Sequence, residues 1–179
     1  MKAIILCAGK STRTYPLTVT RPKPLLPLLN RPIIEFQLEG LYSFVDEFIL
    51  VVGYRQEMIQ QRLGDNWKGK KITYVIQEEQ RGTGHAVLMC EKEVQGPFIA
   101  MNGDDLFDPN DLKNLAQQKR PSALVKEVPN PKDYGIYELD SDNKVKKLVE
   151  KPKVIFSNIA NIGAYLFTSE IFPILHNTP

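Results

Sequence analysis

One segment of the chain combines glycine and cationic residues in a way that suits a phosphate group. Residues 9–24 follow the apolar run 3–8 and contain Gly9, Arg13 and Lys23. A flexible backbone after a buried strand can turn its N–H groups toward phosphate oxygens. Arg13 adds a planar fork for bidentate phosphate contacts, and Lys23 adds a mobile positive charge. The spacing matches neither a Walker loop nor a dinucleotide fingerprint, and such loops, taken alone, are more often solvated connections.

A second segment carries residues that suit the edge of a nucleobase. Gln77 offers an amide that both donates and accepts hydrogen bonds, and Gly82 lets the backbone come close to a base. The donor and acceptor spacing favours a pyrimidine. His85 could act as an acid or a base, but it lies in a stretch with helical spacing, which favours a structural role.

A third segment places carboxylates directly after an apolar run. Asp104 and Asp105 follow residues 98–101 and the pair Asn102–Gly103. Taken alone, Gly-Asp is a turn signal. A carboxylate at a strand end can also hold Mg²⁺ against phosphates, and Asp104 is the better candidate of the two.

Alternating strands and helices should bring these three segments together. Apolar runs predict strands, helical spacing predicts helices between them, and Pro32 opens the first helix. This alternation favours an α/β fold with a doubly wound, mostly parallel sheet, in which ligands bind at the carboxyl ends of the strands. The predicted strands are 3–8, 48–52, 72–76 and 98–101, and the predicted helices are 32–44, 58–63, 83–93 and 108–118.

The pattern changes after residue 120. Short strand-like pieces are separated by Pro, Asn, Asp and Lys clusters, and residues 140–143 resemble a hairpin turn. We therefore expect two parts, one at 1–120 that carries the three segments and a small β-rich one at 121–179. The strand-like pieces are 125–128, 136–139, 145–149 and 159–167, and a helix begins near 168–170.

The first segment resembles the sugar-1-phosphate nucleotidyltransferases, whose signature is a strand, then Gly-x-Gly-Thr-Arg, then Pro-Lys-Pro downstream. Two positions depart from that signature: Ser11 replaces a glycine and Thr14 replaces a leucine. We expect the Ser11 side chain to crowd the phosphates or to require a negative φ. The matching residues are Gly9, Thr12, Arg13, Pro16, Pro22, Lys23 and Pro24.

The resemblance spans the whole chain and implies a Rossmann-like nucleotidyltransferase fold, with a nucleotide-binding part at 1–120 and a sugar-binding part at 121–179. A sugar-phosphate oxygen, already ionised at neutral pH, would attack the α-phosphorus of UTP or dTTP, and pyrophosphate would leave. Arg13 and Lys23 would be catalytic, and Asp104 would bind Mg²⁺. Glucose or N-acetylglucosamine is favoured over mannose as the sugar. The implied nucleotide-binding residues are Ala8, Gly9, Ser11, Thr12, Gln77, Gly82 and Thr83, and the implied sugar-phosphate ligands are Gly135, Glu150, Lys151 and Asn161.

A non-catalytic regulatory or scaffolding subunit with the same fold is the alternative. Ser11 favours this alternative, whereas the joint presence of Arg13, Lys23 and Asp104 argues against it. The chain does not decide between UTP and dTTP, or which sugar is used.

Composition indicates a soluble globular chain with small-molecule partners. The net charge is only +2 and the basic residues are scattered along the chain. Both features argue against nucleic acid or an anionic membrane as a partner. No apolar run approaches the roughly 18 residues of a membrane span, and we expect a cytoplasmic location. Cys7 and Cys90 have no metal-like spacing and are expected to be buried thiols.

The last residues predict an unfinished amphipathic helix. Ile171, Phe172, Ile174 and Leu175 would lack an apolar partner, so we expect either a homo-oligomer or a missing C-terminal region. Some relatives carry a β-helix acyltransferase domain there. The 179 residues should then bind nucleotide but hold Mg²⁺ poorly, with weak catalysis, because relatives take a second metal ligand from a later strand.

Overall fold

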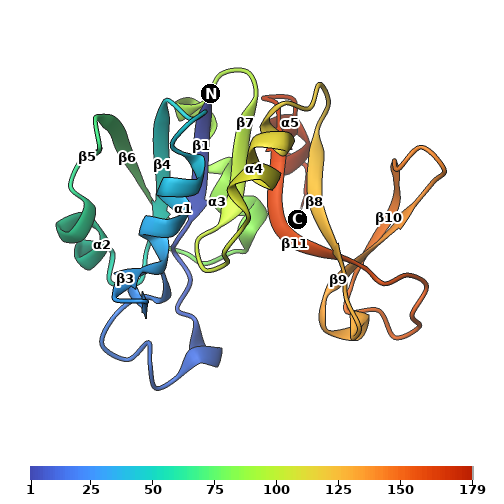
Figure 1. Ribbon diagram of the computed structural model, residues 1–179, viewed down its shortest axis with the longest axis horizontal. Helices are drawn as coiled ribbons and strands as arrows, with labels where there is room; N and C mark the ends of the chain where they lie inside the picture. Colours follow the sequence, from blue (N-terminus) through green and yellow to red (C-terminus); the bar gives the residue numbers. More distant parts are fainter. Residues whose placement is uncertain (179) are drawn as a thin grey trace. The chain divides into compact units, whose positions relative to one another are not determined.

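The computed structural model describes residues 1–178, apart from the side chain of Arg13 (Figure 1). Within that range the chain forms two compact units. The first comprises residues 1–122 and 164–179, of which Pro179 is not described, and the second comprises residues 123–163. The predicted division at 120/121 lies close to the first of these limits. The final residues, however, return to the first unit, because the last strand and helix pack against its sheet.

A mixed, partly parallel sheet forms the centre of the first unit. The pairs β1–β4, β1–β7 and β4–β6 are parallel, with Ile4 opposite both Ile49 and Ala100. The edges are antiparallel, since β5 pairs with β6 and β11 pairs with β7 through residues 164–167. The predicted α/β class is confirmed. The strands are β1 (Lys2–Leu6), β4 (Glu47–Val52), β5 (Asn66–Trp67), β6 (Lys70–Ile76), β7 (Phe98–Asn102) and β11 (Ile159–Phe167).

Helices cover both faces of this sheet, with α1 on the near side and α3 on the far side in Figure 1. Helix α1 packs with α4, and α3 packs with α5. The predicted helix at 83–93 is interrupted, because the backbone tightens after α3 and Cys90 N–H bonds to the Val87 carbonyl. The first helix begins one residue after Pro32. The helices are α1 (Ile33–Leu41), α2 (Gln56–Leu63), α3 (Thr83–Leu88), α4 (Pro109–Ala116) and α5 (Ile171–His176).

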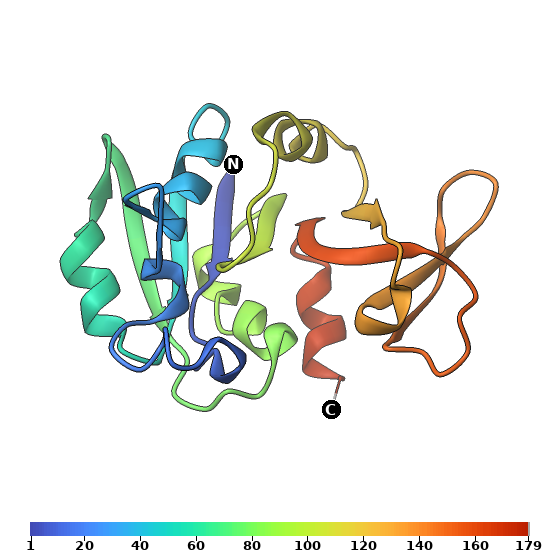
Figure 2. The same cartoon turned by 60° about the horizontal axis from the view of Figure 1, so that its bottom comes forward.

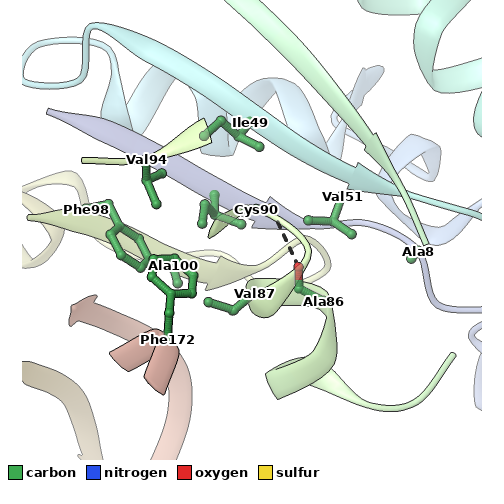
Figure 3. Close-up of a cluster of buried hydrophobic side chains, with 11 residues drawn as sticks. Ala8, Ile49, Val51, Ala86, Val87, Cys90, Val94, Phe98, Ala100 and Phe172 are labelled. Carbon is green, nitrogen blue, oxygen red and sulfur yellow. Dashed lines mark hydrogen bonds between the residues drawn. The ribbon is translucent and has the colours of Figure 1, made fainter. Parts of the chain in front are cut away.

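Alternate strand residues build a core on each face of the sheet. On the α3 side, Ile4, Ile49 and Ala100 share a cluster with Val87 and Cys90 (Figure 3). The intervening residues, such as Ile5 and Leu50, are fully buried on the other face. Successive side chains of a strand point to opposite faces of the sheet, and helices cover both faces. Every residue of such a strand is therefore buried, which explains the continuous apolar runs in the sequence.

The expectation that α5 lacks an apolar partner is wrong for most of its residues. Phe172 stacks on Phe98, with ring centroids 5.8 Å apart, and only 2% of Phe172 is exposed. Ile171 and Leu175 pack against the same cluster. Only Ile174 points outward, with 61% of its surface exposed. The apolar face of α5 is therefore covered within the first unit.

Antiparallel strands make up the second unit. β9 (Gly135–Leu139) pairs with β10 (Val145–Glu150), and Ala160 of β11 lies opposite Ile136 of β9. The turn predicted at 140–143 is present: the Asn143 N–H bonds to the Asp140 carbonyl. The remaining strands of the chain are β2 (Pro27–Leu28) and β3 (Arg31–Pro32), which form a small hairpin, and β8 (Ser122–Glu127), which pairs with β11. Among the described residues, no helix is long and apolar enough to cross a bilayer.

The packing of α5 predicts a large effect at one residue and a small one at a neighbour. Phe172→Ala should lower the free energy of unfolding by about 3–5 kcal/mol, because it opens a cavity beside Phe98. Ile174→Ala on the exposed face should change it by less than about 0.5 kcal/mol. Urea denaturation followed by circular dichroism measures both. Equal losses would show that α5 is not docked through Phe172.

Candidate active site

A cavity of about 390 Å³ lies where the parallel strands of the first unit end. In Figure 2 the segments that follow β1 and β6 run along the same edge of the sheet. The three segments singled out in the sequence therefore meet, as their positions after parallel strands predicted. The cavity is lined by Leu6, Cys7, Ala8, Gly9, Ser11, Pro24, Gln77, Gln80, Gly82, Thr83, Ala86, Asn102 and Asp104.

Two close backbone approaches bring the strand ends together. A Cβ atom on Gly53 would lie 2.9 Å from the Gln77 carbonyl oxygen and 3.1 Å from that of Ala8. A Cβ on Gly103 would lie 2.5 Å from the Leu6 carbonyl oxygen. A side chain at either position would force the neighbouring backbone carbonyls to move, so glycine is strongly favoured at each. The sequence marked both glycines only as strand ends.

The backbone conformation of Ser11 differs from the expected one. Its φ of 51° and ψ of 47° lie in the left-handed region, where a glycine would also lie, so a negative φ is not required. Thr14 and Thr18 hold this turn, because their hydroxyl groups donate to the Ser11 carbonyl at 2.7 and 3.1 Å. The two departures from the family signature, Ser11 and Thr14, thus belong to one hydrogen-bonded turn.

The other residues expected to contact phosphates differ in whether they line the cavity. Ala8, Gly9 and Ser11 line the cavity, whereas Thr12 is exposed at the start of a short 3₁₀ turn (Thr12–Thr14) and does not. The side chain of Arg13 lies outside the described part of the structure, so its predicted role is not tested there.

Lys23 and Asp104 form an ion pair beside the cavity. The Lys23 ammonium donates to Asp104 Oδ2 at 2.7 Å, and 24% and 35% of the two side chains are exposed. Both residues were predicted to act on phosphates, Lys23 as a cation and Asp104 as a metal ligand. The pair joins the first and third segments of the site and keeps a positive and a negative charge within reach of a ligand.

Buried contacts fix the segment that carries Asp104. The Gln37 amide, only 2% exposed, donates to the carbonyls of Asn102 at 2.9 Å and Asp105 at 2.6 Å. Sequence reasoning missed Gln37, because a polar residue within a helix carries no signal of its distant partner. Beneath this segment, burial raises the pKa of the Cys7 thiol, and the nearby Asp104 carboxylate raises it further. Cys7 is therefore a buried thiol rather than a reactive one.

The second segment (residues 77–83, the base segment) forms a further part of the cavity wall. Gln77, Gly82 and Thr83, which we expect to contact the nucleotide, all line the cavity. Gln77 is 4% exposed, and its amide nitrogen lies 3.3 Å from the Gly82 carbonyl oxygen and 3.0 Å from His85 Nδ1. Gln80, which the sequence did not single out, donates to the Ala8 carbonyl at 2.8 Å. This bond ties the base segment to the start of the phosphate segment (residues 8–24).

The second unit brings three of its four predicted ligands together. Gly135 and Glu150 are register partners, and a Cβ on Gly135 would lie 2.8 Å from Glu150 Oε2. The same point is 3.6 Å from the Cβ of Asn161. Lys151 follows Glu150, is exposed, and donates its backbone N–H to the Tyr134 carbonyl at 2.9 Å. The Glu150 carboxylate and the Asn161 side chain thus flank the buried Gly135 of β9, which lies between β10 and β11.

A family model described as nucleotidyl transferase matches residues 2–178. The chain belongs to the nucleotidyl transferase family. It is 43% identical over 179 residues to a bifunctional protein GlmU of Methanococcus maripaludis, covering 99% of this chain and 42% of that protein. It is also 34% identical to the UTP–glucose-1-phosphate uridylyltransferase AglF of Haloferax volcanii, covering 98% of this chain and 75% of AglF.

A solved nucleotidyl transferase structure shares the fold. UDP-glucose pyrophosphorylase complexed with UDP-glucose superposes with a TM-score of 0.89 at 26% identity, covering 99% of this chain and 79% of that one. The chain spans only about two fifths (42%) of the length of the Methanococcus maripaludis GlmU protein.

The carbonyl oxygens of Gln77 and Ala8 lie so close to Gly53 that a side chain there should destabilise the protein. Gly53→Ala should lower the free energy of unfolding by about 1–3 kcal/mol, because the methyl group would contact two backbone carbonyls. Gly40→Ala is the matched control: its Cβ would lie 3.6 Å from Leu112 Cδ1, an ordinary contact in a helix where alanine is favoured over glycine. Thermal denaturation compares the two, and equal stability of both variants would contradict the close approach.

Proposed function

We propose that the protein transfers a nucleotidyl group from UTP or dTTP to glucose 1-phosphate or N-acetylglucosamine 1-phosphate and releases pyrophosphate. The observation that carries this proposal is a single cavity bounded by the phosphate segment, the base segment and the Lys23–Asp104 pair. Membership of the nucleotidyl transferase family supports the reaction class. The name of AglF, a UTP–glucose-1-phosphate uridylyltransferase, supports this choice of substrates.

The nucleotide would lie with its phosphates against residues 8–12 and its base against Gln77, Gly82 and Thr83. Backbone N–H groups in a strand-to-helix segment are suitable phosphate donors, and Arg13 would add a bidentate cation. Ser11 was the feature that favoured a non-catalytic subunit. Ser11 adopts the left-handed backbone conformation that a glycine at this position could also adopt. The replacement of glycine by serine therefore no longer supports that alternative.

The Lys23–Asp104 pair suits a site that receives a polyanion. A triphosphate would compete with the Asp104 carboxylate for the Lys23 ammonium, because phosphate oxygens are strong acceptors for a cation. The release of Lys23 would free Asp104 Oδ2. Pairing in the absence of ligand thus keeps both charges satisfied until the substrate enters.

Asp104 also fits Mg²⁺, the ion that the family commonly uses. No cluster of three or more potential His, Cys, Asp or Glu ligands occurs in the described part of the chain. Mg²⁺ nevertheless keeps several waters and is often held by one or two carboxylates together with substrate phosphates, so the partly exposed Asp104 carboxylate would hold the ion jointly with the triphosphate. The ion would supply neutralisation of phosphate charge.

Positioning and charge neutralisation would account for catalysis. The sugar-phosphate oxygen is ionised at neutral pH, so no general base is needed, and in-line attack on the α-phosphorus would expel pyrophosphate. Lys23 and Arg13 would stabilise the charge that develops during transfer. In the second unit, Gly135, Glu150, Lys151 and Asn161 would bind the sugar phosphate, with the Glu150 carboxylate accepting from sugar hydroxyls and the Asn161 amide accepting from or donating to them.

Base selection gives the first prediction for this function. UTP and dTTP should bind more tightly than GTP or ATP, because the buried Gln77 amide and the Gly82 backbone suit a pyrimidine edge. Isothermal titration calorimetry of the four nucleotides with the same protein sample measures the order. Tighter binding of GTP than of both UTP and dTTP would refute the base assignment.

The ion pair gives the second prediction. Lys23→Ala should lower turnover by about 100- to 1,000-fold in a sugar-dependent pyrophosphate-release assay, with little loss of stability, because a charge opposite the transferring phosphoryl group is removed. Asp104→Asn should raise the Mg²⁺ concentration needed for half-maximal rate.

A control for charge removal is Lys68→Ala. Lys68 also forms a carboxylate pair, with Glu39 at 2.5 Å, but it is half exposed and does not line the cavity. Its turnover should match the unmodified protein. Wild-type turnover in Lys23→Ala, or an unchanged Mg²⁺ requirement in Asp104→Asn, would show that the phosphate site lies elsewhere.

A further inference from the structure

The orientation of the base-reading amide is fixed by contacts inside the protein. Gln77 is 4% exposed, and within the described residues both of its side-chain contacts use Nε2, one to the Gly82 carbonyl and one to His85 Nδ1. An amide nitrogen only donates, so His85 Nδ1 must accept. This contact requires the His85 tautomer that carries its proton on Nε2.

This arrangement decides which atom of Gln77 is left for a ligand. Both hydrogens of the amide nitrogen are directed at protein acceptors, and Gln77 lines the cavity, so Oε1 is the polar atom available there. Oε1 can only accept a hydrogen bond. Uracil and thymine carry a proton on N3 and can donate to it, whereas cytosine has a lone pair at N3 and would be repelled.

His85 is the stronger of the two groups that hold the amide. Its contact with Nε2 is 3.0 Å, compared with 3.3 Å for the Gly82 carbonyl. The helix that carries it is also firmly placed, because Ala86 and Val87 of α3 are buried in the core cluster with Phe98 (Figure 3). Without His85, the amide could rotate and present its nitrogen to the ligand instead.

We propose that His85 is a specificity-determining positioning residue: it holds the Gln77 amide with Oε1 toward the ligand, which selects uracil and thymine over cytosine. This inference rests on the proposed function, because it concerns the base of the nucleotide that is transferred. It replaces the expectation that His85 has a purely structural role. It also assigns no acid or base step to the imidazole.

Kinetic discrimination between UTP and CTP tests the proposal. The ratio of kcat/KM for UTP to that for CTP should fall at least about tenfold in His85→Leu, the equivalent of one hydrogen bond. His85→Asn should retain most of the ratio, since its Oδ1 can accept near the place of Nδ1. A structural role would lower both rates in parallel, so an unchanged ratio in a folded His85→Leu variant would overturn the proposal.

A second measurement does not depend on how the His85 variants fold. Nitrogen-15 NMR of the unmodified protein at pH about 8, where imidazole side chains are ordinarily neutral, reports the tautomer of each histidine. The only other histidine is His176, and the variant His176→Asn assigns the two signals. An unprotonated Nδ1 in His85 is expected. A proton on Nδ1 would overturn the proposal, because Gln77 Nε2 could not then donate to it.

Failure of the proposed function would look different. An unmodified protein that turned over neither UTP nor dTTP with any sugar 1-phosphate would refute the transferase assignment, whatever the His85 tautomer. Turnover of UTP together with a protonated Nδ1 would refute only the role of His85.

Discussion

The close approach of parallel strand ends is the constraint on which the candidate site depends. β1, β4, β6 and β7 run parallel to one another. A Cβ atom added at Gly53 or Gly103 would lie within 3.1 Å of backbone carbonyl oxygens on neighbouring segments. A side chain at either glycine would push apart the segments that carry Gly9, Gln77 and Asp104. The fold thus converts three loops that are distant in sequence into the walls of one cavity.

Long-range hydrogen bonds then set the side chains on those walls. Gln37 holds the Asp104 segment from the helix below it, Gln80 ties the base segment to Ala8, and His85 orients Gln77. Each of these groups satisfies a backbone or side-chain partner rather than a ligand. The cost of ordering the site is consequently met during folding, and a ligand would meet groups that are already in place.

The sequence predicted the elements better than the contacts between them. Apolar runs located β1, β4 and β7, because strands buried on both faces leave that pattern. The site segments followed from their positions after those strands. The partners of Gln37, Gln80 and Phe172 could not be predicted, since a local pattern gives the period of an element but not what packs on it. Ser11 was judged by residue type alone, whereas its left-handed backbone is held by Thr14 and Thr18.

A crystal structure of the protein grown with UTP and Mg²⁺ tests the central claim most directly. The uracil should contact Gln77 and Gly82, with the N3–H directed at Oε1, and the phosphates should contact residues 8–12 and Lys23. In that complex Lys23 should have moved from Asp104 to a phosphate oxygen. A nucleotide bound elsewhere, or bound in the cavity with its base and phosphates in the reverse order, would contradict the assignment of these segments.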